Sequence, residues 1–446
     1  MKLTVKSILI LVAFLIIFIN FVDGSTSLKN WTLAKPLSSY EGDAYQPQIS
    51  INRNGDAIVV WAQQDGYSER FKICGSYYTK NNWKQLKEVK TLLTDGINIA
   101  DLPKVAINDM GNAALVFTQS HKEDDLSYGQ INVFSAFLSG KEWSPLKKIS
   151  SNMTWDGVFS PAIAIDPKGD AFAVWMQTTT PNKHIFSNHY AKGKWEKSEL
   201  ISDINVKDSY NPQIAINSKG DAFVVWDQLD KDVYKVFVNS SSGGRFQTPK
   251  TISNNTTGHA YDQQLAIDKN GNVFVVWTQW KDNFYKIYTS TCSLGNWTPP
   301  KEISSNSLGS AYSPQIAVNS SGDFVVVWMQ WEGDYYRIYA RTFFENSWQK
   351  EEIISNNKLG NAYIPKVVID NNNNVIVVWK VLDGSLYKVY ANNYSSGKWG
   401  EEKLISNNTL GNIDQPQIVM DEKGDAIVVW TQSDGSYYRI YSAQYK

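Results

Sequence analysis

Residues that commonly form reactive or metal-binding sites are scarce in this sequence. Its 446 residues include only two cysteines, Cys74 and Cys292, and four histidines, at positions 121, 184, 189 and 259. The two cysteines belong to the first and fifth copies of the repeat described below. In a ring of eight copies they would lie much farther apart than the roughly 7 Å between Cα atoms that a disulfide allows. The histidines lack the spacing of metal ligands. We therefore expect no disulfide, no metal site and no cofactor.

Arginine is also scarce. Only six of the 43 basic residues are arginines, and the net charge is −1. Phosphate groups are commonly bound by bidentate guanidinium contacts, and nucleic acid requires a positive surface. The composition therefore argues against nucleic acid as a partner. The chain also has no Gly-x-Ser-x-Gly elbow and no phosphate-binding loop, so we assign no catalytic residues.

One long apolar run stands at the N-terminus. Lys2 and Lys6 precede the apolar residues from Ile8 to Val22, and small residues follow at Gly24. This pattern predicts a signal peptide over residues 1–24, a domain over residues 25–446, and a secreted or cell-surface protein. An uncleaved anchor is the alternative, although about 15 apolar residues are short for a membrane span. We expect no membrane insertion after cleavage.

The rest of the chain consists of eight copies of one phrase. A clear copy reads Pro-Gln-Ile-Ala-Ile-Asn-Ser-Lys-Gly-Asp-Ala-Phe-Val-Val-Trp over residues 212–226. The first two intervals are 56 and 58 residues, and every later interval is 51 residues. A strict period of this size indicates a repeat array or a propeller. The copies begin at Pro47, Pro103, Pro161, Pro212, Gln263, Pro314, Pro365 and Pro416.

Each copy has the pattern of β-strands. A Pro-x-Ile-x-Ile segment alternates with period two, a turn with Asn or Asp and Gly follows, and a continuous apolar run ends at Trp. Two further strands complete the unit, and four short antiparallel strands predict one propeller blade. The continuous apolar run needs cover on both faces, which stacked blades provide. The repeated Trp residues are therefore expected in the core.

The two ends of the chain distinguish a ring from an open solenoid. The last copy stops after three strands at Lys446, and the phrase around Trp31 matches the fourth-strand phrase around Trp297. An N-terminal strand that completes the last blade would leave no sheet edge at the seam. A solenoid would instead expose two ends without capping units. We predict an all-β, eight-bladed β-propeller of four-stranded antiparallel blades, closed by the N-terminal strand.

Aromatic and amide residues recur at the blade period in loops predicted to share one rim. Aromatic rings stack on the C–H faces of sugars while amides bond the hydroxyls, so these residues are candidates for ligand binding. The alternative is that they only build turns and fill the wedges between blades. The candidates are Tyr261, Tyr312, Tyr363, Gln279, Gln330 and Trp331.

The predicted third strands carry a cation once per blade, at Lys235, Lys286, Arg337, Lys388 and Arg439. We add Lys286 and Arg337 to the candidates, because they could meet an anionic group of a ligand beside Gln279 and Gln330. The alternative is that their stems pack on the neighbouring blade while the charged heads reach water or a carbonyl group.

A polar side chain also follows the repeated Pro near the predicted axis. It is Gln in most copies, and Lys104 and Lys366 in the second and seventh. These residues could line the mouth of the central channel.

The phrase Pro-x-Ile-Ala-Ile-Asp-x-x-Gly-Asp-Ala-x-Val-Val-Trp resembles the repeat of secreted bacterial β-propeller proteins, which are distantly similar to the sialidase-like superfamily. The resemblance covers nearly all of the chain after residue 24, and it implies the fold rather than an activity. Sialidases carry an arginine triad and Ser-x-Asp-x-Gly-x-Thr-Trp boxes, which this chain lacks. Their catalytic residues are therefore not transferred.

These observations favour a secreted or surface-exposed binding protein, more than an enzyme. It would recognise a glycan or an extracellular protein through equivalent sites between blades, with affinity raised by multivalency. The alternative is a glycan-active enzyme with a single site in the propeller mouth. That site would be built around the atypical second and third copies, including residues 121–125 and 178–184. The sequence does not indicate an oligomeric state.

Overall fold

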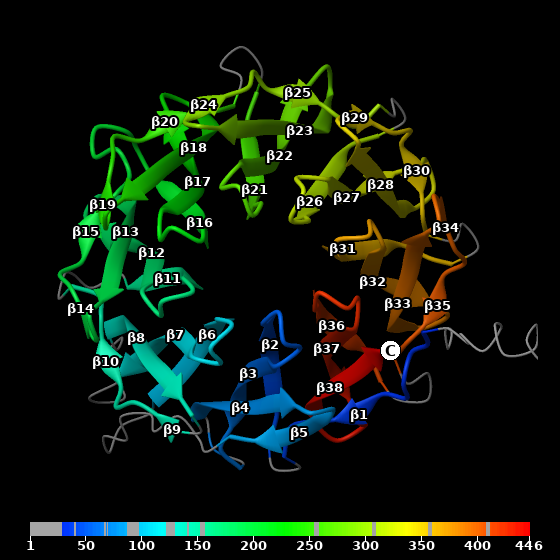
Figure 1. The fold of residues 1–446 in the computed structure, drawn as a ribbon, viewed down its shortest axis with the longest axis horizontal. Helices are drawn as coiled ribbons and strands as arrows, with labels where there is room; N and C mark the ends of the chain where they lie inside the picture. The colour runs from blue at the N-terminus through cyan, green and yellow to red at the C-terminus, as the bar shows by residue number, and fades with distance from the viewer. Residues whose placement is uncertain are drawn as a thin grey trace, which may run out of the picture.

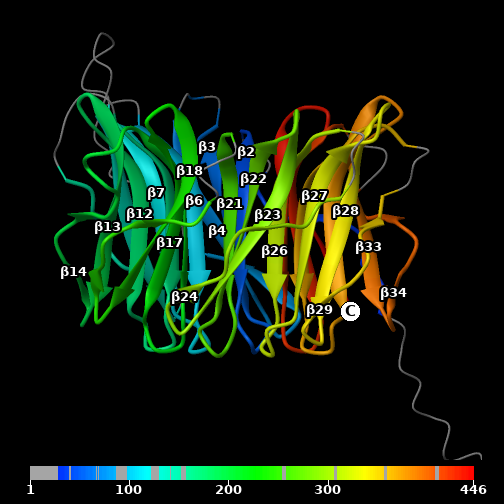
Figure 2. The same ribbon diagram turned by 90° about the horizontal axis from the view of Figure 1, so that it is seen from above.

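The computed structural model describes residues 29–39, 42–66, 68, 70–86, 98–121, 130–140, 142–151, 157–253, 258–305, 309–355, 359–406 and 411–446. These residues form strands and turns, arranged as eight four-stranded antiparallel blades around one axis (Figure 1). The strands run between the two faces of the ring, as the side view shows (Figure 2). The predicted eight-bladed propeller is confirmed. The predicted signal peptide lies outside the described residues.

The first strand of each blade lies nearest the axis, and the second packs against it. The first strands are β2 (Ala44–Ile51), β6 (Asn98–Ile107), β11 (Val158–Ile165), β16 (Ser209–Ile216), β21 (Ala260–Ile267), β26 (Ala311–Val318), β31 (Ala362–Ile369) and β36 (Ile413–Met420). The second strands are β3 (Ala57–Gln64), β7 (Ala113–His121), β12 (Ala171–Thr179), β17 (Ala222–Asp230), β22 (Val273–Lys281), β27 (Phe324–Trp331), β32 (Val375–Asp383) and β37 (Ala426–Ser433).

In each blade the third strand lies between the second strand and a short outer strand. The outer strand is split into two pieces in most blades. The third strands are β4 (Phe71–Thr79), β8 (Gln130–Ser139), β13 (Asn182–Ala191), β18 (Val233–Ser242), β23 (Phe284–Ser293), β28 (Tyr336–Phe344), β33 (Leu386–Ser395) and β38 (Tyr438–Tyr445). The outer pieces are β5 (Asn82–Gln85), β9 (Glu142–Trp143), β10 (Lys147–Lys148), β14 (Lys194–Trp195), β15 (Glu199–Leu200), β19 (Arg245–Phe246), β20 (Lys250–Thr251), β24 (Asn296–Trp297), β25 (Lys301–Glu302), β29 (Ser347–Trp348), β30 (Glu352–Ile353), β34 (Lys398–Trp399), β35 (Lys403–Leu404) and β1 (Lys35–Pro36).

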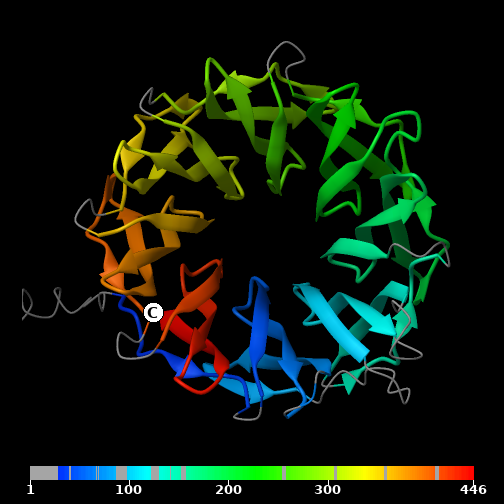
Figure 3. The same cartoon turned by 180° about the vertical axis from the view of Figure 1, so that it is seen from behind.

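The N-terminal strand closes the ring, as predicted. β1 pairs with β38, and Pro36 lies opposite Tyr441 in the register that Glu302 and Tyr288 show in the fifth blade. The first and last segments of the described chain accordingly lie side by side in both face views (Figures 1 and 3). The last blade therefore gains its fourth strand from the other end of the chain.

The turn between the first two strands is fixed by an Asn or Asp side chain. In the third blade, Oδ1 of Asp166 accepts hydrogen bonds from the backbone N–H groups of Lys168 and Asp170, at 2.8 and 2.9 Å. The turn then needs a left-handed residue, which Gly169 supplies with φ of 94°. In the seventh blade Asn373 takes this place with φ of 62°, since Asn tolerates the left-handed region.

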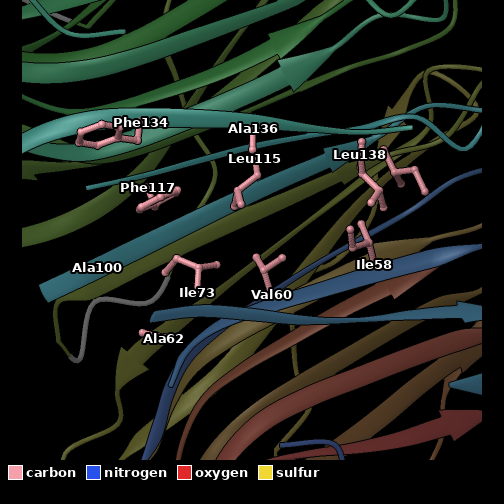
Figure 4. Close-up of a cluster of buried hydrophobic side chains, with 12 residues drawn as sticks. Ile58, Val60, Ala62, Ile73, Ala100, Leu115, Phe117, Phe134, Ala136 and Leu138 are labelled. Atoms are coloured by element: carbon pink, nitrogen blue, oxygen red, sulfur yellow. The ribbon is translucent and has the colours of Figure 1, made fainter. Parts of the chain in front are cut away.

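The second strands are buried on both faces, which explains their continuous apolar runs. Between the first two blades, Ile58 and Val60 on β3 face Leu115 and Phe117 on β7, with Ile73 of β4 beside them (Figure 4). The repeated tryptophans are fully buried, which confirms their predicted place in the core. They are Trp61, Trp175, Trp226, Trp277, Trp328, Trp379 and Trp430.

None of the described segments is an apolar helix of the length needed to cross a bilayer.

Candidate functional site

The direction of the first strands gives the ring two different faces. Each first strand begins on one face, which we term the entry face. That face also carries the loops between blades and the loops between second and third strands. Each first strand ends on the opposite face, at the Asn- or Asp-led turns, so we term this the turn face. All of the predicted ligand-binding residues lie toward the entry face.

Six tyrosines form a continuous strip on the entry face across the fifth, sixth and seventh blades. They alternate between the starts of first strands and the starts of third strands. Neighbouring ring centroids are 5.2, 5.3, 6.3, 5.8 and 6.4 Å apart along the strip, within the usual range for aromatic pairs. We term this strip the tyrosine band; in order it comprises Tyr261, Tyr285, Tyr312, Tyr336, Tyr363 and Tyr387.

The rings of the tyrosine band are half-buried, so that part of each remains open to solvent. Burial raises the pKa of Tyr336 and Tyr363, and burial with a hydrogen bond to Tyr285 raises the pKa of Tyr261. The phenols of these three residues therefore stay uncharged at neutral pH. Each keeps a hydroxyl that both donates and accepts hydrogen bonds.

A β-bulge positions the first-strand tyrosines. The sequence suggested that Tyr261, Tyr312 and Tyr363 lie in loops, but each is the second residue of a first strand. The register shifts after each of them, and the next residue is left-handed; Ser313, for example, has φ of 52°. Because a bulge redirects the strand and its side chains, a feature of the strand itself rather than of a loop sets where these rings lie.

Gln279 and Gln330 are placed differently from the prediction. Both are fully buried, and their Oε1 atoms accept hydrogen bonds of 2.9 Å from the indole N–H groups of Trp277 and Trp328. The Gln330 amide also lies 3.4 Å from the Gly309 carbonyl oxygen in the loop from the preceding blade. Gln330 thus joins the core to that loop, and neither side chain reaches the surface where a ligand would bind.

Lys286 and Arg337 are also interior. Lys286 is 8% exposed, with its ammonium 5.5 Å from the centre of the Phe284 ring. Arg337 is 4% exposed and donates hydrogen bonds to the carbonyl oxygens of Leu359 and Gly360, at 3.1 and 2.8 Å. Arg337 thus holds the loop between the sixth and seventh blades. Its geometry matches the alternative in which a charged head reaches a carbonyl group.

Two tryptophans extend the aromatic surface beside the tyrosine band. The Trp331 ring meets Tyr336 edge-on at 5.2 Å, and Trp280 meets Tyr285 in the same way at 5.0 Å. Trp280 is 38% exposed, which is unusual for so large an apolar ring. Of the eight predicted residues, the structure therefore brings together Tyr261, Tyr312, Tyr363 and Trp331, and it adds Trp280.

A buried carboxyl group near one end of the tyrosine band was not identified from the sequence. Asp227 follows Trp226, where the other blades have Ala, Thr, Met or Lys, so this departure from the repeat was a visible signal. It is 4% exposed, and burial raises its pKa to about 7. The amide of Asn211 donates a hydrogen bond of 3.2 Å to it. Asp262, next to Tyr261, also has a pKa raised by burial.

The atypical second and third blades supply no comparable cluster among the described residues. Residues 122–125 lie outside the described part of the chain. His184 is 3% exposed, with its Nδ1 atom 3.4 Å from the Ser202 hydroxyl, and burial lowers its pKa. Within the described ranges, no group of three or more His, Cys, Asp or Glu side chains is placed to hold a metal ion.

Comparison with known proteins identifies the fold and no closer relationship. No protein-family model and no curated protein sequence matches the chain. Solved structures that are similar to this chain include an ulvan lyase of polysaccharide lyase family PL25, with a TM-score of 0.50 and 9% identity over 81% of this chain and 98% of the lyase. They also include a protein of unknown function from Dyadobacter fermentans, with a TM-score of 0.43 and 14% identity over 65% of this chain and 94% of that one. The intramolecular trans-sialidase of Ruminococcus gnavus has a TM-score of 0.41 and 11% identity over 76% of this chain and 93% of its own. The chain is thus an eight-bladed β-propeller, and its likeness to these solved structures extends to the fold alone.

Proposed function

We propose that the protein binds glycans through the tyrosine band on its entry face. The observation that carries this proposal is the continuity of six half-buried tyrosines over three successive blades. Aromatic rings present flat apolar faces to the C–H groups of pyranoses, and the adjoining hydroxyls bond to sugar hydroxyls.

The band contains two equivalent groups of three rings. Tyr261, Tyr285 and Tyr312 form the first, and Tyr312, Tyr336 and Tyr363 form the second. Because the two groups share Tyr312, they lie next to each other and suit successive units of one oligosaccharide. Linking two weak contacts in one ligand raises the overall affinity, since the second contact becomes intramolecular.

The expected export of the chain would place this surface where extracellular glycans occur. The ulvan lyase with the same fold was solved bound to a saccharide of GlcA and Rha3S. At 9% identity that likeness extends to the fold alone, so the proposal rests on the tyrosine band.

A glycan array followed by titration calorimetry tests this function. We expect short saccharides to bind weakly with two per chain, and a longer oligosaccharide of the same sugar to bind one per chain with higher affinity. Absence of any glycan ligand, or binding that requires no residue of the band, would contradict the proposal.

One observation favours an enzyme as the second candidate. Glycosidases use two carboxyl groups, one of which stays protonated near neutral pH to act as the acid. Asp227 and Asp262 both have pKa values raised by burial, and Asp262, which interacts with Asp227, follows Tyr261 at the end of the band. Hydrolysis or elimination of a glycan found on the array, abolished by Asp262→Asn while binding persists, would establish this candidate.

A further inference from the structure

The central channel carries two lysines that the proposed glycan site does not use. Lys104 and Lys366 occupy the same position in β6 and β31, where five other blades have Gln and the third has Ala162. Each ammonium donates one hydrogen bond to the Gln of the preceding blade. Lys104 lies 2.9 Å from Oε1 of Gln48, and Lys366 lies 3.1 Å from Oε1 of Gln315.

These two lysines belong to blades that are not neighbours in the ring. Burial lowers the pKa of Lys366 to about 8, and the positive charge of Lys104 adds to this effect. Because the first strands line the axis (Figure 1), the space that the two blades share is the central channel. Both ammonium groups therefore extend into it.

The positive charge in the channel is uncompensated. In the described part of the chain, neither Lys104 nor Lys366 forms an ion pair with a carboxylate. Two like charges in a partly buried site repel each other, and an opposite charge between them would relieve that repulsion. Each ammonium has three N–H groups and uses one, so both retain donors for such a partner.

The channel also provides neutral donors and an aliphatic collar. Gln213, Gln264 and Gln417 make no side-chain hydrogen bond within the described residues, so their amides are available to a bound group. Three residues further along each first strand, about 10 Å away at 3.3 Å per residue, an aliphatic collar that includes Ile51 and Ile267 lines the opening on the turn face. A polar ligand therefore meets donors on the entry-face side of this collar.

We propose that the channel binds a small oxyanion, such as sulfate, phosphate or a carboxylate, between Lys104 and Lys366. Two ammonium groups and free amides form a donor set without acidic residues, which selects anions over cations and neutral sugars. The anion is either free in solution or carried by an acidic sugar that enters from the entry face.

Titration calorimetry at pH 6.5 tests this site, with sodium sulfate, sodium phosphate and sodium glucuronate as probes in chloride buffer of constant ionic strength. We expect one anion per chain. Lys366→Gln should lower the affinity about ten-fold or more, and the double variant Lys104→Gln, Lys366→Gln should abolish binding. Gln is the residue of most other blades at this position, so these variants should keep the fold.

Lys269→Gln is the matched control, because Lys269 lines the opening beyond the collar and its loss changes the net charge equally. Its affinity for the anion should equal that of the parent.

Preference for glucuronate assigns the site to sugar carboxylates, and preference for sulfate or phosphate assigns it to free tetrahedral anions. Unchanged affinity in the double variant, or no binding of any of the three probes to the parent, would overturn the proposal. Tyr312→Ala should leave anion binding intact, which separates this site from the tyrosine band.

Discussion

Trp31 and Tyr445, at opposite ends of the described chain, form an antiparallel bridge, and their ring centroids lie 5.3 Å apart. The same place in the fifth blade pairs Trp297 with Cys292 within one continuous segment. The ring is thus closed by an ordinary repeat contact made between the two ends of the chain.

We predict that a chain starting at residue 40 is much less stable than one starting at Lys29. The shorter chain loses backbone hydrogen bonds of about 1 kcal/mol each, including those that link Thr32 and Leu37 to β38 and Asn30 to Lys446. It also exposes a sheet edge that promotes aggregation. Chemical denaturation and light scattering of the two chains measure the effect. Equal stability and a monomeric shorter chain would contradict closure by β1.

The repeated tryptophans give a matched pair of variants. The indole N–H of Trp328 donates to Gln330, but Val381 replaces the Gln beside Trp379, whose indole nitrogen has no partner among the residues that the structure describes. Phe is acceptable at this position, since Phe117 occupies it in the second blade. We predict that Trp328→Phe costs about 1–2 kcal/mol more than Trp379→Phe, because it leaves a buried acceptor unpaired. Equal losses in urea unfolding would show that this hydrogen bond contributes nothing.

Asp227 should make stability depend on pH. Burial raises its pKa from the ordinary value of 3.8 to about 7, so the folded state retains a proton that the unfolded chain releases. The stability that this proton supplies is full below about pH 4 and is lost as the pH rises to about 7. Asp227→Asn should therefore gain stability relative to the parent over this range, by up to about 4 kcal/mol.

Asp232→Asn is the control for this prediction, since the Asp232 side chain is 97% exposed. Its unfolding free energy should follow that of the parent at every pH. A constant difference between Asp227→Asn and the parent from pH 4 to pH 8 would show that Asp227 is ionised throughout.

A strained residue follows one tyrosine of the band. Ile364 has φ of 53°, a region that β-branched residues rarely adopt. The equivalent residue in the fourth blade is Asn211, with φ of 52°. Since Asn tolerates this conformation, we predict that Ile364→Asn stabilises the protein by about 1 kcal/mol. Ser313→Asn, at the same place in the sixth blade, should have a smaller effect, and thermal unfolding compares the two.

The fold was predictable from the sequence because its signals are local and repeated. The continuous apolar run before each Trp is a local signal, and the strict period and the match of the phrases around Trp31 and Trp297 come from repetition of short phrases along the chain. The burial of Gln279 and Gln330 was not predictable from the sequence. A Gln two residues after a Trp is equally compatible with a position on the rim, and only the hydrogen bond from the indole places it in the core.

The influence of Lys104 on Lys366 could not be predicted either, because it depends on how the blades are arranged around the axis. Asp227 could have been found as a departure from the repeat. Its raised pKa, however, depends on how the neighbouring blade buries it.

The central claim, that the tyrosine band binds glycans, is tested most directly by Tyr312→Ala. Tyr312 belongs to both groups of rings, so its loss should weaken binding of the best oligosaccharide at least ten-fold, while thermal unfolding changes by little because the ring is half-exposed. Tyr190→Ala is the control: its ring is also half-buried and stacks on Phe137, at 3.8 Å, near the turn face. The account predicts that calorimetry finds parental affinity in Tyr190→Ala and a large loss in Tyr312→Ala. Parental affinity in Tyr312→Ala would contradict it.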